Sequence, residues 1–155
     1  MTTNESRLKQ YLVERIATRS DYKGLLRFPS YLEIETVNAC NARCPMCTIN
    51  AWKRAGRPMT DELFGKIARE AIAHAADLER VSLYRNGEPL LDKKLGPRVA
   101  MLKDGGIKNV FISTNVSLLD SARARELLRA GLDTIIMSID SLDKDTYEGI
   151  RSRLH

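Results

Sequence analysis

Two periodicities of apolar residues alternate along the chain from residue 30 onward. The segment YLEIETV at 31–37 alternates apolar and polar residues with the period of a β-strand. Other segments carry apolar residues three or four positions apart, which is the period of an amphipathic helix. The predicted strands are residues 31–37, 80–85, 108–114 and 133–139. The predicted helices are residues 60–76, 92–106, 120–131 and 143–151.

Local signals mark the faces and ends of two of these helices. In the segment 60–76 one apolar face is expected to carry Leu63, Ile67, Ala71 and Ala75. In the segment 120–131, Asp120 is a predicted N-cap and Gly131 lies just past the expected end.

The strand–helix order predicts an α/β fold with a parallel sheet and right-handed crossovers. Residues 30–155 supply about three and a half strand–helix units, fewer than a closed barrel requires, so the sequence predicts the front part of a larger fold. Residues 1–29 precede this core and include a predicted helix at 5–19, which indicates an N-terminal helical extension.

Three predicted strands turn from apolar or aromatic to polar along one face as they reach their carboxyl ends. The residues along these faces, in chain order, are Ser82, Tyr84 and Asn86; Phe111, Ser113 and Asn115; and Ile136, Ser138 and Asp140. The opposite face of each strand is aliphatic and is expected to lie under the helices. The aliphatic residues are Val81, Leu83, Val110, Ile112, Ile135, Met137 and Ile139. Because ligands of parallel α/β folds bind at this end of the sheet, a binding site is expected here, although strands also turn polar where loops begin.

All three cysteines lie in NACNARCPMC at 38–47, as Cys40, Cys44 and Cys47. An odd number at this close spacing is a poor disulfide framework and indicates a metal-binding or redox-active group. Zinc usually takes four protein ligands, and the only histidines are His74, in a predicted helix, and His155. Three thiolates on a [4Fe–4S] cluster would leave one iron open, which suits a catalytic site.

Charge and composition narrow the classes of partner. The formal net charge is +5, but basic residues are interspersed with acidic ones, which is typical of a solvated surface. Aromatic residues make up 6% of the chain, which argues against a base-stacking platform, so no nucleic acid is expected. With no membrane-length apolar run and no secretory signal, we expect a cytoplasmic protein without a membrane partner.

Four motifs in the expected order together resemble the radical S-adenosylmethionine (radical SAM) enzymes. They are the C-x3-C-x2-C loop after the first strand, NGEP at 86–89, ISTN at 112–115 and SIDSLDKDTYEGIR at 138–151. The resemblance covers residues 30 to 151, and the last motif is similar to members that carry a SPASM or twitch extension. It implies the N-terminal part of a (βα)6 partial TIM-like barrel.

The resemblance also implies roles for residues. Cys40, Cys44 and Cys47 would bind three irons of a [4Fe–4S] cluster, and S-adenosylmethionine would bind the fourth. Two glycines of the family pattern are replaced, by Asn86 and Ser141. The residues implied to bind the cofactor are Met46, Gly87, Glu88, Pro89, Ser113, Asn115, Ser138, Asp140 and Arg151.

The implied activity is reductive cleavage of S-adenosylmethionine to a 5′-deoxyadenosyl radical, which abstracts hydrogen from a peptide, sugar or other small molecule. Such an oxidoreductase or modifying enzyme would use a one-electron donor such as flavodoxin or ferredoxin. Glu33 and Glu35 share one strand face, where Glu35 would either touch substrate or lie on an exposed edge. Two alternatives stay open, a non-catalytic iron–sulfur fragment and a zinc- or thiol-based binding module.

Overall fold

The computed structural model describes residues 7, 10, 11, 14, 28–53 and 56–152. The chain divides into two compact units, Met1–Ser30 and Tyr31–His155. Within the first unit, the four described residues of the predicted helix at 5–19 are helical, and the side-chain amide of Gln10 donates to Glu14 at 3.0 Å. The other positions of that prediction lie outside the described residues.

The second unit is built on a parallel sheet of four strands in the order β1-β2-β3-β4. Its backbone registers align Leu32 with Val81, Val81 with Val110, and Ile112 with Ile135. The predicted α/β fold with a parallel sheet is confirmed, and every strand is shorter than its predicted segment. The strands are β1 (Tyr31–Glu33), β2 (Arg80–Ser82), β3 (Val110–Thr114) and β4 (Thr134–Met137).

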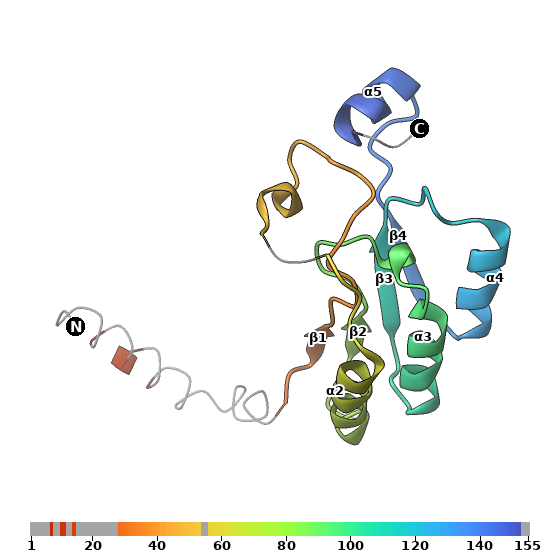
Figure 1. The fold of residues 1–155 in the computed structure, drawn as a ribbon. Helices are drawn as coiled ribbons and strands as arrows, with labels where there is room; N and C mark the ends of the chain where they lie inside the picture. Colours follow the sequence, from red (N-terminus) through yellow and green to blue (C-terminus); the bar gives the residue numbers. More distant parts are fainter. Residues whose placement is uncertain (1–6, 8–9, 12–13, 15–27, 54–55, 153–155) are drawn as a thin grey trace. The chain divides into compact units, whose positions relative to one another are not determined.

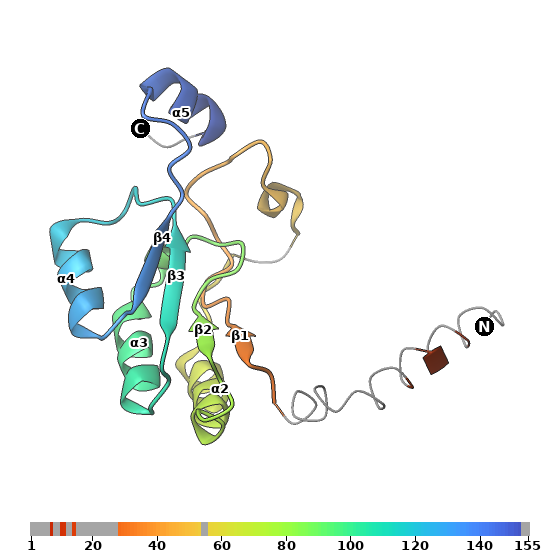
Figure 2. The same ribbon diagram turned by 180° about the vertical axis from the view of Figure 1, so that it is seen from behind.

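Helices cover one face of this sheet. Figure 1 shows α2, α3 and α4 in front of the strands, and Figure 2 shows the strands in front of these helices. None of the helices in the described part of the chain has the length and apolar character needed to cross a membrane. The helices are η2 (Thr48–Ala51), α2 (Asp61–Ala73), η3 (Pro89–Leu91), α3 (Leu95–Asp104), α4 (Ser121–Arg129) and α5 (Lys144–Ile150).

Side-chain caps explain where three helices begin. Thr60, Asp120 and Asp143 each accept a hydrogen bond from the backbone N–H three residues ahead, at 3.3, 2.7 and 2.9 Å. Each cap satisfies one of the N–H groups that lack a partner in the first helical turn. After α4 the chain turns at Gly131, whose φ of +84° suits a residue without a Cβ. The predicted cap and stop signals of this helix are confirmed.

The core lies between the sheet and the helices. Val81, Leu83, Val110 and Ile112 are fully buried, which confirms the predicted aliphatic face of β2 and β3. The prediction was wrong for β4, because Met137 and Ile139 are 54% and 50% exposed. The reason is positional, since β4 is an edge strand of the sheet and α5 lies beyond its carboxyl end rather than over its face (Figure 1).

The buried face of α2 also differs from the prediction. Phe64, Ala68 and Ala71 are buried, whereas Leu63 is 47% exposed. Ala71 belongs to both the predicted and the observed face, so the prediction is confirmed there. It is wrong at Leu63, because the adjacent Phe64, about 100° further round the helix, is buried instead. The aromatic side chain of Phe64 offers more apolar surface to bury than Leu63 does, and it packs under the guanidinium of Arg98 at 4.9 Å.

Arg98 on α3 ties three segments together below the site. Its guanidinium donates to the Asp92 carboxylate at 2.8 Å and to the carbonyls of Met59 at 2.5 Å and Thr36 at 3.4 Å. The side chains of Arg98 and Asp92 are only 4% and 2% exposed. The chain leaving β1 is therefore held against the start of α2 and of α3. This contact fixes the beginning of the segment 38–47, which contains the three cysteines and is called the cysteine loop below.

Candidate functional site

The cysteine loop lies at the carboxyl ends of the strands, between β1 and η2 (Figure 1). All three cysteines are free thiols; Cys44 is buried, and Cys40 and Cys47 are partly buried. They pack against a small cluster that includes Ala42 and Tyr147. A cavity of about 200 Å³ is lined by all three thiols and by residues that follow β2, β3 and β4. The sequence-predicted convergence at this end of the sheet is therefore present in the fold.

Most of the cofactor-binding residues implied by the resemblance line this cavity. These are Gly87, Glu88, Ser113, Asn115, Ser138 and Arg151. Three others lie outside its lining. Met46 is 63% exposed, Pro89 is buried at the start of η3, and Asp140 forms an ion pair with Arg151.

Backbone crowding shapes the loop at 86–89. A Cβ placed on Gly87 would lie 2.1 Å from the carbonyl oxygen of Val37 and 2.9 Å from that of Ala39. The N–H of Glu88 donates to the same Ala39 carbonyl at 2.7 Å. This loop therefore lies directly against the start of the cysteine loop, and position 87 requires a residue without a side chain.

Glu35 supports the same loop from β1's side. One oxygen of its carboxylate accepts from the backbone N–H of Asn86 at 3.1 Å and of Gly87 at 3.4 Å. The Glu35 carboxylate therefore binds the backbone of the loop at 86–89, so it does not lie on an exposed strand edge. Glu33 pairs with Arg85.

Glu88 connects the ends of β2 and β3. Its side chain is buried, with the residue 3% exposed, and accepts from the Thr114 hydroxyl at 2.6 Å and the Asn115 N–H at 2.9 Å. It also accepts from the Leu90 N–H at 3.0 Å, which caps η3. A buried carboxylate with three donors is a strong anchor, because charge-assisted hydrogen bonds gain strength where water is excluded.

The far wall of the cavity is polar. The hydroxyls of Ser113 and Ser138 lie 3.3 Å apart on β3 and just after β4. Arg151 follows α5, pairs with Asp140, and donates to the sulfur of Cys44 at 3.9 Å. Burial lowers the pKa of Arg151, but its hydrogen bonds to Asp140 and Cys44 outweigh burial and raise that pKa above its usual value. The guanidinium therefore stays charged beside the thiols.

The thiols suit a multinuclear group better than a single ion. Burial is the largest effect on Cys40 and raises the pKa of its thiol, an effect that the Ala42 N–H only partly offsets. Metal binding at this position would therefore release a proton. Among the described residues, no three cysteine, histidine or acidic side chains converge as a site for one metal ion. A cluster whose irons each take one thiolate does not require such convergence.

Sequence reasoning missed Thr114 and Arg85 in the cavity lining. Thr114 falls between the predicted polar residues of β3 yet its hydroxyl reaches Glu88, a contact across 26 positions that no local pattern reveals. Arg85 breaks the predicted face of β2 and lines the cavity beside Tyr84. Its interaction with Glu33 spans 52 positions, so only the paired register of β1 and β2 exposes it.

A second cavity, of about 490 Å³, lies where α2 and α3 begin. Four of the charged groups in its lining pair with one another, since Arg98 pairs with Asp92 and Lys94 pairs with Asp61. It contains no thiol, so the cavity at the cysteine loop is the better candidate for chemistry.

Comparisons with known proteins agree on one family. The model of the radical SAM superfamily matches residues 34–155. The chain is 33% identical over 118 residues to a probable GTP 3′,8-cyclase of Methanocella arvoryzae, covering 76% of this chain and 36% of that protein. It is 34% identical over 128 residues to the GTP 3′,8-cyclase of Heliobacterium modesticaldum, covering 77% of this chain and 37% of that protein.

Among solved structures, BtrN in complex with AdoMet and 2-DOIA superposes with a TM-score of 0.66 and 26% identity. The match covers 78% of this chain and 50% of BtrN. The chain thus spans little more than a third of the curated relatives named above and half of this structure.

Proposed function

Since the chain belongs to the radical SAM superfamily, we propose that its cysteine loop holds a [4Fe–4S] cluster and that the adjoining cavity takes S-adenosylmethionine. The observation that carries this proposal is the lining of one cavity by three free thiols together with the ends of β2, β3 and β4. Soft thiolates are the ligands that iron–sulfur clusters use, and three of them leave one iron for another ligand.

The cluster, when bound, supplies an electron for cleavage of the S-adenosylmethionine sulfonium to a 5′-deoxyadenosyl radical that abstracts hydrogen from a substrate. Cys40, Cys44 and Cys47 would each bind one iron. Gly87 has no side chain, which allows the loop at 86–89 to lie against the backbone of Val37. Glu88 holds this loop against the end of β3. These residues keep the walls of the cavity in place.

The polar wall supports recognition of the amino-acid part of S-adenosylmethionine. Arg151 carries a positive charge that complements a carboxylate, and Asp140 orients its guanidinium. The paired hydroxyls of Ser113 and Ser138 offer donors and acceptors to the ribose or carboxylate. We propose a flavodoxin- or ferredoxin-type protein as the electron donor and a peptide, sugar or other small molecule as the substrate.

The test uses the full chain under anaerobic conditions. Reconstitution with iron and sulfide is expected to load about four irons per chain and to give the visible absorption of a [4Fe–4S] cluster. After reduction, added S-adenosylmethionine should yield 5′-deoxyadenosine, measured by liquid chromatography and mass spectrometry, with and without GTP as a trial substrate. Single alanine substitutions of Cys40, Cys44 and Cys47 should abolish product, whereas Thr48→Ala, at an exposed position beside Cys47, should not.

The outcomes separate the alternatives. Cluster absorption without 5′-deoxyadenosine would overturn the catalytic proposal in favour of an iron–sulfur-binding fragment. Stoichiometric zinc with no uptake of iron would overturn it in favour of a zinc module.

A further inference from the structure

The side chain of Asn115, just after β3, sits in a closed set of hydrogen bonds. Its amide nitrogen donates to the side-chain oxygen of Asn41 at 3.0 Å, and its oxygen accepts from the Ser117 hydroxyl at 2.6 Å. The amide nitrogen of Asn41 donates to the same Ser117 hydroxyl at 2.8 Å, which closes the ring. The three side chains therefore fix one orientation of the Asn115 amide.

This orientation directs the Asn115 amide nitrogen at a thiol. The nitrogen also donates to the sulfur of Cys40 at 3.9 Å, and the Ala42 N–H donates to that sulfur at 3.4 Å. Asn115 is 6% exposed, so water has little access to compete for the contact. Cys40 is thus the thiol that receives both a backbone and a side-chain N–H.

The backbone that follows Asn115 is strained in support of this arrangement. Val116 has a φ of +60°, a conformation that β-branched residues rarely adopt. It is held by a hydrogen bond from the Val116 N–H to the Thr114 hydroxyl at 3.1 Å and one from the Ser117 N–H to the Asn115 side-chain oxygen at 3.1 Å.

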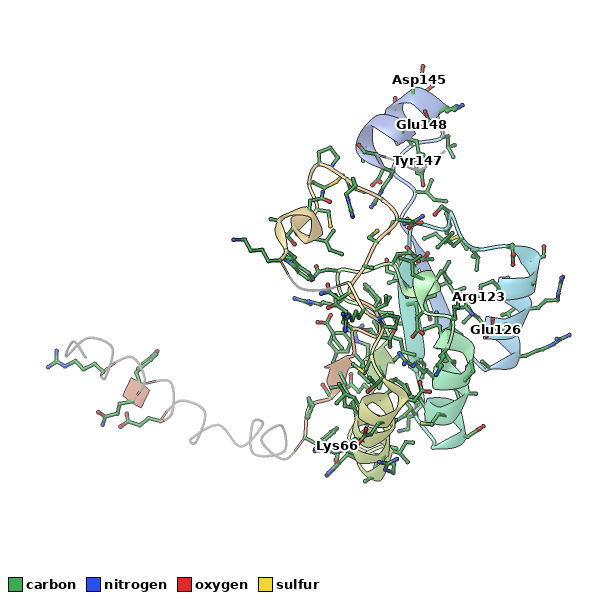
Figure 3. The ribbon with its side chains drawn as sticks, in the orientation of Figure 1. Lys66, Arg123, Glu126, Asp145, Tyr147 and Glu148 are labelled. Atoms are coloured by element: carbon green, nitrogen blue, oxygen red, sulfur yellow. The ribbon has the colours of Figure 1, made fainter. Side chains whose placement is uncertain are left out.

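The backbone of Asn115 itself is anchored from two sides. Its N–H donates to the buried Glu88 carboxylate at 2.9 Å, and its carbonyl accepts from the Tyr147 hydroxyl at 3.4 Å. Figure 3 labels Tyr147 on α5, above the end of β3. The backbone position of Asn115 is therefore fixed by the N-cap of η3 and by α5, in addition to β3, which it follows.

We propose that Asn115 is a positioning residue that donates a hydrogen bond to the Cys40 sulfur of the loaded cluster and thereby favours the reduced cluster. This inference rests on the proposed function. Reduction adds negative charge that spreads onto the ligand sulfurs, and hydrogen bonds to the sulfurs are one of the factors that set cluster potentials. Asn41 and Ser117 serve by holding the amide in the donating orientation.

The experiment measures the midpoint potential of the reconstituted cluster in the full chain. Asn115→Ala should make reduction at least threefold less favourable, a shift of about 28 mV to more negative potential at 59 mV per tenfold for one electron. Asn41→Ala, which keeps the donor but removes its clamp, should shift the potential in the same direction by less. Asn50→Ala is the matched control, because the Asn50 amide donates to the Cys44 carbonyl rather than to a sulfur. The midpoint potential of the cluster in this variant should equal that of the wild type.

A spectroscopic readout distinguishes the hydrogen bond from a general structural effect. In the reduced cluster of the wild type and of Asn50→Ala, exchangeable protons of the Asn115 amide and of the Ala42 N–H should both couple to the electron spin. The Asn115 coupling should be lost in Asn115→Ala, while the Ala42 coupling remains. If Asn115→Ala assembles an intact cluster whose midpoint potential and proton coupling equal those of the wild type, the inference is overturned and the proposed function still stands. If Asn115→Ala does not assemble a cluster, Asn41→Ala decides, and an unchanged potential there overturns the inference. A wild-type chain that holds no cluster would overturn both proposals.

Discussion

At the scale of single residues, Gly87 sets how closely the loop at 86–89 approaches the cysteine loop. A Cβ at this position would lie 2.1 Å from the Val37 carbonyl oxygen, which is backbone and cannot rotate away. Gly87→Ala is therefore expected to destabilise the fold by about 1–3 kcal/mol, the range for overpacking, and to lower iron retention. Urea denaturation of the metal-free chain and iron content after reconstitution measure the two effects.

A second glycine provides the control for this prediction. Gly149, on α5, is exposed, and a Cβ added to it would meet no atom within 4 Å. Gly149→Ala should stabilise the chain slightly, by about 0.5–1 kcal/mol, because alanine loses less backbone entropy in a helix. If Gly87→Ala were as well tolerated as Gly149→Ala, the close approach of the two loops would be refuted.

The residues of the site differ in how far the sequence alone could assign them. The cysteine spacing and the polar ends of the strands are local patterns, and the thiols and the serines of the lining follow from them. The contacts of Glu88 with Thr114 and Asn115 join positions 26 and 27 residues apart. Such partners are set by strand register, which a periodicity does not specify.

At the scale of secondary structure, α5 begins at an aspartate whose charge contributes to the helix. The Thr146 backbone N–H donates to the Asp143 carboxylate, and this hydrogen bond lowers the carboxyl pKa below its usual value of 3.8. The stabilisation is therefore complete above the unfolded pKa and is lost as the pH falls through the lower folded pKa. The cap matters to the site because α5 leads directly to Arg151.

Removing that cap should loosen α5 in a pH-dependent way. Asp143→Ala is expected to increase amide hydrogen exchange across residues 144–150 at neutral pH, because the first turn loses its side-chain acceptor. The difference from the wild type at the same pH should shrink as the pH falls through the lowered folded pKa of Asp143, where the wild-type carboxylate itself becomes protonated. Asp145→Ala, in the first turn but without the cap hydrogen bond, should have a smaller effect; an equal effect would show that charge near the helix start, not capping, is responsible.

The elements themselves were largely predictable, and their ends were not. Periodicity identified the four strands and the helices between them, because burial on one side imposes that pattern. The strands end early, as at Glu33 in β1, where ladder pairing stops while the chain continues toward the cysteine loop. The face of α2 was misjudged at Leu63, because contacts with distant residues, such as that of Phe64 with Arg98, are not visible in a local pattern.

At the scale of the whole molecule, one buried ion pair links the cysteine loop to the helical layer. Arg98 and Asp92 pair at 2.8 Å, while other donors of Arg98 hold the carbonyls of Thr36 and Met59. Arg98 thus contacts the segment after β1, the segment before α2 and the segment before α3. Because both charges are withdrawn from water, each depends on the other for its solvation.

Replacing Arg98 with an uncharged residue should lower the stability of the whole domain. Arg98→Met is expected to lower the free energy of unfolding by about 3–5 kcal/mol, because it leaves the Asp92 carboxylate buried without a positively charged partner. Adding Asp92→Asn should recover part of the loss, since asparagine carries no charge and keeps an acceptor for the Lys94 backbone N–H, which donates at 2.9 Å in the wild type. Lys94→Met, which breaks an exposed ion pair with Asp61, serves as the control and should change stability little. Urea denaturation compares all four chains, and a double variant no more stable than Arg98→Met would show that the lost carbonyl contacts, rather than the stranded charge, account for the cost.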